Sequence, residues 1–324
     1  MKKSRGLFKV LSLCLAILLG LAAAAYADIY TVFEGASLGD PSRFGNLSQQ
    51  EKIITDVYGN NGCPPTAIVN GFVYLQKQYP AIYGTTLVSG YDSTSMANTA
   101  LTLGGSNYLN ILVTKDGNGN ITTMWYYTGM IWGPNLYSEN KAPGRTVYDA
   151  QKYPSATTGP GSWTAAAGPK PDWVSESTTS PTEAFLYNAL SESQALVIAW
   201  NQVNPSNGQI IWSGAGHVLT VTGLTWNSSD KKGTLYYIDP KGGMPHNSPF
   251  WLAANGALWL DYGETNGVRW KRLDGITDWW YSGDAQITVA LAEGPVPTPL
   301  PSTLLLLGSG LLGLAGVGRK LRKS

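Results

Sequence analysis

Cysteine and histidine are scarce in this chain of 324 residues, which contains two of each. One cysteine, Cys14, falls in an N-terminal stretch that has the form of a cleaved export signal. The mature chain would then keep Cys63 alone, which excludes an internal disulfide. Charged residues are also few, at 13% of the chain. A lone cysteine in an exported protein therefore needs another explanation.

The first 27 residues show the three parts of a secretory signal peptide. Four basic residues lie within the first nine, residues 10–21 are apolar, and Ala25-Tyr26-Ala27 supplies a small-x-small cleavage pattern. The apolar stretch is shorter than the roughly 20 residues that a spanning helix needs, which disfavours the alternative of a retained membrane anchor. We expect the mature chain to begin near Asp28.

The last 31 residues, 294–324, have an equally distinct order. A Pro-rich stretch leads into the short apolar segment 304–318, and the basic tip "RKLRK" follows it at once, as the positive-inside rule expects of a membrane segment. This end resembles the PEP-CTERM sorting signal of exported Gram-negative proteins, with Pro299-Leu300-Pro301 in place of Pro-Glu-Pro. The resemblance implies transient anchoring in the inner membrane, cleavage by an exosortase, and release to the cell surface or matrix. A permanent tail anchor is the alternative.

The charge of the remaining body argues against one class of partner. The two ends carry eight of the 22 basic residues and none of the 21 acidic ones, so the body has 14 basic residues against 21 acidic residues. A nucleic-acid-binding protein needs a basic face. We therefore expect no nucleic-acid partner.

Residues 28–293 are enough to bury one sizeable core, as one large domain or two lobes, and their composition suits a fold rich in strands and loops. "KDGNGN" between residues 108–114 and 121–127 predicts a hairpin. It also resembles the start of a calcium loop, but the twelfth position would be Tyr127 rather than Glu. Residues 134–181 are rich in Pro, Gly, Ser and Thr, which predicts a long surface connection. The predicted elements that follow are a helix capped by Thr182, a buried strand at 195–200, and two strands joined by "NSSDKKG".

The sequence places Cys63 at the start of a helix. Pro64 suits the first helical position, and apolar residues then recur at helical spacing, so we predict a helix from Cys63 to about Gln78. A thiol at a helix N-terminus faces backbone N–H groups and the positive end of the helix dipole, which both favour the thiolate. The alternative is an inert buried cysteine, but the polar loop "GNNG" before Cys63 is a poor setting for one.

A nucleophilic cysteine needs a base, and only two histidines are present. His246 lies in the Pro-flanked stretch "GGMPHNSP", which we predict to be a loop without an acidic neighbour. His217 opens a predicted strand. If the connection to the next strand is centred near Ser228, His217 lies opposite Asp239, at the ~5 Å Cβ separation of directly opposed residues. The pairing predicts that Asp239 orients His217.

Three blocks in this order, "GCPPTA", "GHVLTVTG" and "YYIDP", resemble those of papain-like cysteine peptidases. The similar branch includes bacteriocin-leader peptidases, and the spacing of His217 and Asp239 resembles that of streptococcal immunoglobulin-degrading peptidases. The resemblance implies an α+β fold in which the catalytic helix packs on an antiparallel β-sheet. It also implies Cys63 as nucleophile, His217 as base and then acid, and Asp239 as the orienting residue.

The oxyanion donor of that family is a Gln several residues before the cysteine, and position 57 here is Val. Asn61, Asn60 or Lys52 are candidates, with the backbone N–H of Cys63 as the second donor. We favour Asn61.

Our hypothesis is an exported cysteine peptidase that acts on a protein or peptide substrate without a metal or organic cofactor. Two alternatives remain: a transglutaminase-like acyl transferase, which uses the same three residue types, and a non-catalytic surface or biofilm-matrix protein. The aromatic runs 125–127 and 279–281 are candidates for lining a cleft, although large aromatic residues are more often part of a core.

Overall fold

The computed structural model describes residues 29–33, 41–154, 170–202, 210, 216–262, 264–265, 268–269 and 283–297. The predicted export signal, most of the C-terminal tail and the aromatic run 279–281 lie outside these ranges. The described helices are η1 (Pro41–Arg43), α2 (Lys52–Tyr58), α3 (Cys63–Gln78), α4 (Pro80–Tyr83), α5 (Ser93–Gly104), α6 (Tyr127–Lys141) and α7 (Glu183–Ser191). The described strands are β1 (Ile29–Phe33), β2 (Leu112–Lys115), β3 (Ile121–Met124), β4 (Thr146–Lys152), β5 (Val174–Glu176), β6 (Ala195–Gln202), β7 (Gly216–Asn227), β8 (Lys232–Asp239), β9 (Met244–Leu252), β10 (Leu258–Tyr262), β11 (Glu264–Thr265), β12 (Val268–Arg269) and β13 (Gly283–Pro295).

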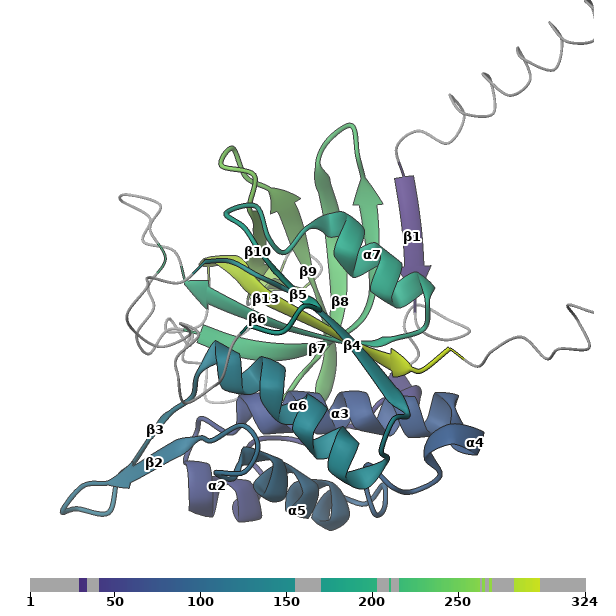
Figure 1. The fold of residues 1–324 in the computed structure, drawn as a ribbon. Coiled ribbons are helices and arrows are strands. Elements are labelled where there is room, and N and C mark those ends of the chain that lie inside the picture. Colours follow the sequence, from purple (N-terminus) through teal and green to yellow (C-terminus); the bar gives the residue numbers. More distant parts are fainter. Residues whose placement is uncertain are drawn as a thin grey trace, which may run out of the picture.

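Six of the strands close into a barrel. The order β6-β7-β8-β9-β10-β13 returns to β6, because β6 pairs with both β7 and β13, and every pair in this ring is antiparallel. β1 adds to β7, β4 adds to β13, and β5 runs parallel to β4. Helices α2 to α6 form a layer below the barrel in Figure 1, whereas α7 lies beside its strands.

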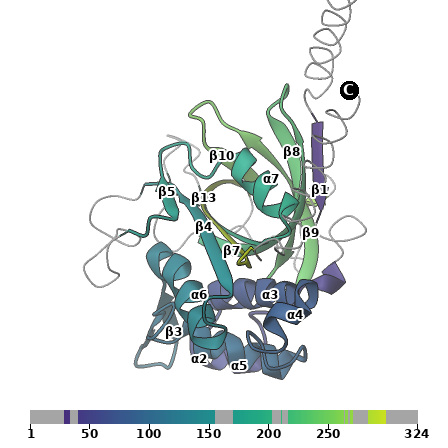
Figure 2. The same ribbon diagram turned by 45° about the vertical axis from the view of Figure 1, so that its right-hand side comes forward.

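Helix α3 is the centre of this helical layer. It is buried along nearly its whole length because it lies between the barrel and the other helices, as Figure 2 also shows. Gly71 permits a close approach to the barrel, since a Cβ there would lie 3.4 Å from the Cβ of Ala195. The Thr220 hydroxyl of β7 donates to the carbonyl of Ala67 at 2.7 Å. The predicted helix from Cys63 to Gln78 is confirmed, and its start is fixed rigidly against β7.

Several other local predictions are confirmed. The hairpin joins β2 to β3, and the Asp116 carboxylate closes its turn by accepting from the backbone N–H groups of Asn118 and Asn120. The Thr182 hydroxyl caps α7 by accepting from the N–H of Phe185 at 3.2 Å. The buried strand predicted at 195–200 is β6. These elements carry strong local signals, so their tertiary setting did not need to be known.

The predicted surface connection at 134–181 is wrong in its first part. Residues 127–141 form α6 with Pro134 inside the helix, and residues 146–152 form β4, whose burial alternates along the strand. Met130, Ile131 and Tyr137 are buried in the helical core, and this packing outweighs the loss of one helical hydrogen bond at Pro134. The same helix takes Tyr127 away from the strand predicted at 121–127, which ends at Met124.

One carboxyl group in the core has no partner among the described residues. Glu293 of β13 is 1% exposed, and neither carboxyl oxygen has a hydrogen bond. It lies opposite Tyr148 of β4. Burial raises the pKa of Glu293 well above its ordinary value of 4.5, because a charge in this setting lacks both solvent and a counter-charge. The group is therefore neutral over a wider pH range when the protein is folded than when it is unfolded.

We expect Glu293→Gln to stabilise the protein above pH 5. With the folded pKa raised, the contribution of Glu293 is complete below about pH 4.5 and is lost as pH rises toward the folded pKa, because the unfolded chain ionises first. The variant lacks this loss, so its free energy of unfolding should exceed that of the wild type by on the order of 1–3 kcal/mol at pH 8. Urea denaturation at pH 4.5 and pH 8 measures the difference, with Glu192→Gln as the exposed control. An equal pH dependence in both proteins would contradict this account.

Candidate active site

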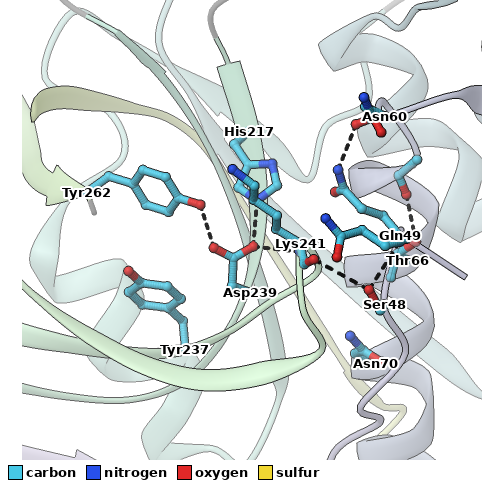
Figure 3. Close-up of polar contacts among 12 residues, drawn as sticks. Ser48, Gln49, Asn60, Thr66, Asn70, His217, Tyr237, Asp239, Lys241 and Tyr262 are labelled. Atoms are coloured by element: carbon cyan, nitrogen blue, oxygen red, sulfur yellow. Dashed lines mark hydrogen bonds and ion pairs between the residues drawn. The ribbon is translucent and has the colours of Figure 1, made fainter. Parts of the chain in front are cut away.

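The side chains of His217 and Asp239 meet inside the protein. Nε2 of His217 lies 2.8 Å from Oδ1 of Asp239, and both residues are at most 2% exposed (Figure 3). The bond uses one ring nitrogen and leaves Nδ1 for another partner. Cys63, 4% exposed, is close enough to the imidazole to contribute to the raised pKa of His217. The three residues predicted from sequence are thus brought together in one chain of contacts.

The observed register of β7 and β8 differs from the predicted one. β7 and β8 pair Leu224 with Leu235, and after a bulge Val221 with Tyr237, whereas a centre at Ser228 predicts Val221 opposite Leu235. One step beyond the last recorded pair would place residue 219 opposite Asp239, so His217 is a diagonal neighbour of Asp239 and not its direct partner. Long side chains reach across such a diagonal. The contact forms across this diagonal, so the predicted direct opposition of His217 and Asp239 is wrong.

The carboxylate of Asp239 is held from three directions. Oδ1 accepts from the backbone N–H of Lys241 at 2.8 Å as well as from His217, and Oδ2 accepts from the hydroxyl of Tyr262 on β10. Burial raises the pKa of Asp239, but His217, Tyr262 and the Lys241 N–H outweigh it and hold the pKa below its ordinary value. Asp239 is therefore a fixed anion. Tyr262 carries no local sequence signal, because its role depends on the closure of the barrel.

This anion determines the charge of His217. Burial lowers the pKa of His217, but the Asp239 carboxylate, which also hydrogen bonds to the ring, and Cys63 outweigh burial and raise the pKa from 6.5 to about 10. The imidazole is therefore protonated at neutral pH. A protonated imidazole beside a thiol is the arrangement that favours a thiolate–imidazolium pair.

The start of α3 offers fewer backbone donors than a usual helix. Pro64 and Pro65 have no N–H, and the N–H of Thr66 donates to the carbonyl of Gly62 at 3.3 Å. This leaves the N–H of Cys63 as the donor that the first residue of α3 provides. Gly62 is also required by packing, since a Cβ there would lie 2.5 Å from Cγ2 of Ile54. The thiol is thus placed by a glycine before it and two prolines after it.

The three candidates for a side-chain oxyanion donor have different hydrogen-bond partners in the structure. Lys52 pairs with Asp56 on the exposed face of α2, with Nζ 2.6 Å from Oδ2, so its charge is engaged at the surface. The carbonyl of Asn60 accepts from Nε2 of Gln49 at 2.7 Å. Asn61 lies two residues before Cys63 and donates its backbone N–H to Tyr58. The structure adds no contact of the Asn61 side chain, and its role stays a prediction.

Gln49 is a residue that the sequence did not single out. Its backbone N–H donates to the carbonyl of Pro240, directly after Asp239, at 2.7 Å, while its side chain binds the loop before Cys63 (Figure 3). The segment that carries it is fixed to α3, because the side-chain amide of Asn70 binds both backbone groups of Leu47. Gln49 therefore links the two loops that carry Cys63 and Asp239. Gln49 precedes Cys63 by 14 positions, so no local sequence pattern indicates this role.

His246 does not lie in a loop, which corrects the prediction. It belongs to β9 and faces Tyr237 of β8. Burial lowers the pKa of His246, and the nearby Asp239 carboxylate opposes this shift, so an acid is near after all. The carboxylate nevertheless bonds to His217 through Oδ1 and to Tyr262 through Oδ2. Among the described residues, no cluster of three or more His, Cys, Asp or Glu side chains is arranged to hold a metal ion.

Comparison with known proteins identifies the C-terminal end of the chain. Residues 297–320 match the PEP-CTERM protein-sorting motif, which confirms the predicted sorting signal and implies export, membrane-anchored sorting to the cell surface and processing by an exosortase. No curated protein matches the chain significantly. In the part of the chain that the structure describes, no helix has the length and hydropathy to cross a membrane; residues 304–318 lie beyond it.

Proposed function

We propose that the exported chain is a cysteine peptidase with a papain-like arrangement, in which a helix that begins at the nucleophile packs on an antiparallel barrel that carries the base. The observation that supports this most directly is the buried chain of contacts from Asp239 through His217 to Cys63. A structural histidine needs neither a fixed carboxylate on one side nor a thiol on the other. The proposed domain covers residues 28–293.

The proposed reaction has two steps, acylation of Cys63 and hydrolysis of the thioester, and His217 transfers a proton in each. The Cys63 thiolate attacks the substrate carbonyl carbon, and the N–H of Cys63 donates to the developing oxyanion. The amide C–N bond then breaks, the His217 imidazolium gives its proton to the leaving amine, and a thioester remains on Cys63. Water attacks the thioester while His217 takes its proton, and the C–S bond breaks, which releases the acid and restores the thiolate–imidazolium pair.

Substrate access sets a condition on this proposal. Because Cys63 is 4% exposed, a polypeptide reaches the thiol only if the elements that cover it move apart. An extended segment of a denatured protein needs a smaller opening than a folded domain does. We therefore propose unfolded segments or flexible linkers as the substrate class.

The test is to incubate the mature protein with a denatured protein mixture and to identify new termini by mass spectrometry. We expect new N-termini that are absent with Cys63→Ala, the matched control. Addition of a primary amine separates the acyl-transfer alternative: a peptidase leaves free carboxyl ends, whereas a transferase leaves ends that carry the amine. If neither product forms under any condition, the proposed activity is wrong and a non-catalytic surface or matrix role is favoured.

A further inference from the structure

The hydroxyl of Tyr262 reaches Asp239 from another strand of the barrel. Tyr262 ends β10 and Asp239 ends β8, with β9 between the two strands. The hydroxyl donates to Oδ2 of Asp239, whereas His217 and the backbone N–H of Lys241 share Oδ1. Figure 3 shows the tyrosine hydroxyl and the imidazole at different oxygens of the carboxylate. Among the described residues, Tyr262 is therefore the side chain that holds the oxygen not used by His217.

The ring of Tyr262 is fixed in the barrel interior by other aromatic rings. Its centroid lies 4.5 Å from that of Trp200 on β6 and 5.7 Å from that of His217. Trp200 lies opposite His217 in the β6–β7 ladder, and the centroids of these two rings are 6.0 Å apart. All three residues are buried. Tyr262 therefore contacts both members of the ion pair, Asp239 through its hydroxyl and His217 through its ring.

Titratable groups from five elements surround the pair of Asp239 and His217. They are Cys63 of α3, His217 of β7, Tyr237 of β8, His246 of β9 and Tyr262 of β10, with Asp261 of β10 acting on Tyr237. Burial lowers the pKa of His246 and raises the pKa values of both tyrosines well above 10, so these three groups are uncharged at neutral pH. The hydroxyl of Tyr262 therefore stabilises the ionised carboxylate without adding a positive charge that competes with His217.

We propose that Tyr262 is a positioning residue of the candidate active site: its hydroxyl fixes the Asp239 carboxylate, and this carboxylate then holds the imidazole of His217 toward Cys63. The torsion that turns an aspartate carboxylate is broad, so donors on both oxygens restrict it more than donors on one oxygen. Tyr262 acts through Asp239, the group to which its hydroxyl bonds, and not on a reacting atom. The inference rests on the proposed function for its reaction, whereas the contact itself does not depend on any activity.

Tyr262→Phe removes the hydroxyl and keeps the ring. We expect kcat to fall about tenfold with KM within about twofold of the wild type, because one hydrogen bond to a charged group is lost and no group that binds substrate changes. The upper pH limit of activity should not fall, since the Asp239 anion that sustains the imidazolium remains. Profiles of kcat and KM against pH, on a peptide recovered from the cleavage screen, measure these quantities.

A spectroscopic measurement tests the same contact without turnover. In Cys63→Ala, NMR titration of the ring carbons of His217 follows the protonation of its partner Asp239 at low pH. The bond from Tyr262 helps to hold the pKa of Asp239 below its ordinary value, so this inflection should move to higher pH when the hydroxyl is removed. If Tyr262 served only to pack its ring, the inflection would stay in place, because phenylalanine keeps the ring.

Tyr237→Phe is the matched control. The hydroxyl of Tyr237 is also buried near Asp239, but it bonds to the hydroxyl of Ser248 on β9 at 2.9 Å. Its ring centroid lies 6.4 Å from that of Tyr262. The variant should keep kcat within about twofold of the wild type and leave the low-pH inflection unchanged. Equal effects of the two tyrosine variants would overturn the proposal, because they would reflect a general loosening of the barrel interior.

A double variant tests whether Tyr262 acts through Asp239. Asp239→Asn/Tyr262→Phe should be no less active than Asp239→Asn, because the hydroxyl no longer has a carboxylate to fix. If Tyr262→Phe alone does not fold, a double variant that folds supports the proposal, since the amide removes the buried charge that lacks a donor. Losses that add in the double variant, or failure of both variants to fold, would overturn it. A shifted inflection in a protein that never cleaves would overturn the peptidase activity and keep the effect of Tyr262 on Asp239.

Discussion

Cys63→Ala and His217→Ala should each remove nearly all peptide hydrolysis, a loss on the order of 10⁴-fold or more, and the double variant should be no worse. The reason is that the two groups form one reacting unit. Without the thiol no thioester forms, and without the imidazole the thiol has neither its proton acceptor nor a donor for the leaving amine. The measurement is kcat/KM on a peptide recovered from the cleavage screen, for both single variants and the double variant.

Two controls make this result specific. His246→Ala removes the other histidine near Asp239 and should retain activity within a few-fold. His217→Gln keeps a polar side chain of similar size beside Asp239, so it separates loss of chemistry from loss of folding; circular dichroism and thermal unfolding report the latter. Additive losses in the double variant, or a His246→Ala variant as inactive as Cys63→Ala, would contradict the assigned roles.

The position of Cys63 could be predicted because its signals are local. A polar Gly-containing loop, prolines at the first helical positions and apolar residues at helical spacing all belong to one continuous stretch, and α3 begins at Cys63 as predicted. The meeting of His217 and Asp239 was predicted from a register that proved wrong by two to three positions. The two side chains nevertheless meet, because a bulge and a diagonal contact bring them together.

The parts that could not be predicted depend on the closed barrel. Tyr262 reaches Asp239 only because β10 and β8 are both strands of one ring with β9 between them. Gln49 reaches the site through the Asn70 clamp on α3, which joins residues 23 positions apart. Pro134 suggested a loop, and only the buried face of α6 overrides that signal. Each of these contacts joins segments that are distant in the sequence, so no local sequence pattern predicts it.

Asp239→Asn should reduce activity at neutral pH by about 10- to 100-fold, less than loss of His217, and should move the alkaline limit of activity to lower pH. The asparagine carbonyl still accepts from Nε2 of His217, so the ring stays oriented, but a charge-assisted bond becomes a neutral one. Coulombic attraction to Asp239 is the largest cause that raises the pKa of His217 to about 10. The imidazolium is present below that pKa and is lost above it, so removal of the anion must lower the upper limit.

The sign of this shift can be measured with and without turnover. Profiles of kcat/KM from pH 5 to pH 11 give the alkaline limit, and NMR titration of the imidazole carbons gives the pKa of His217 directly, because the chain has only two histidines and His246→Ala assigns them. Lower values in Asp239→Asn by both methods support the Asp239–His217 ion pair. An unchanged limit in Asp239→Asn, or a shifted one in His246→Ala, would mean that a group other than His217 controls the reaction, because His217 bonds to the Asp239 carboxylate through Nε2.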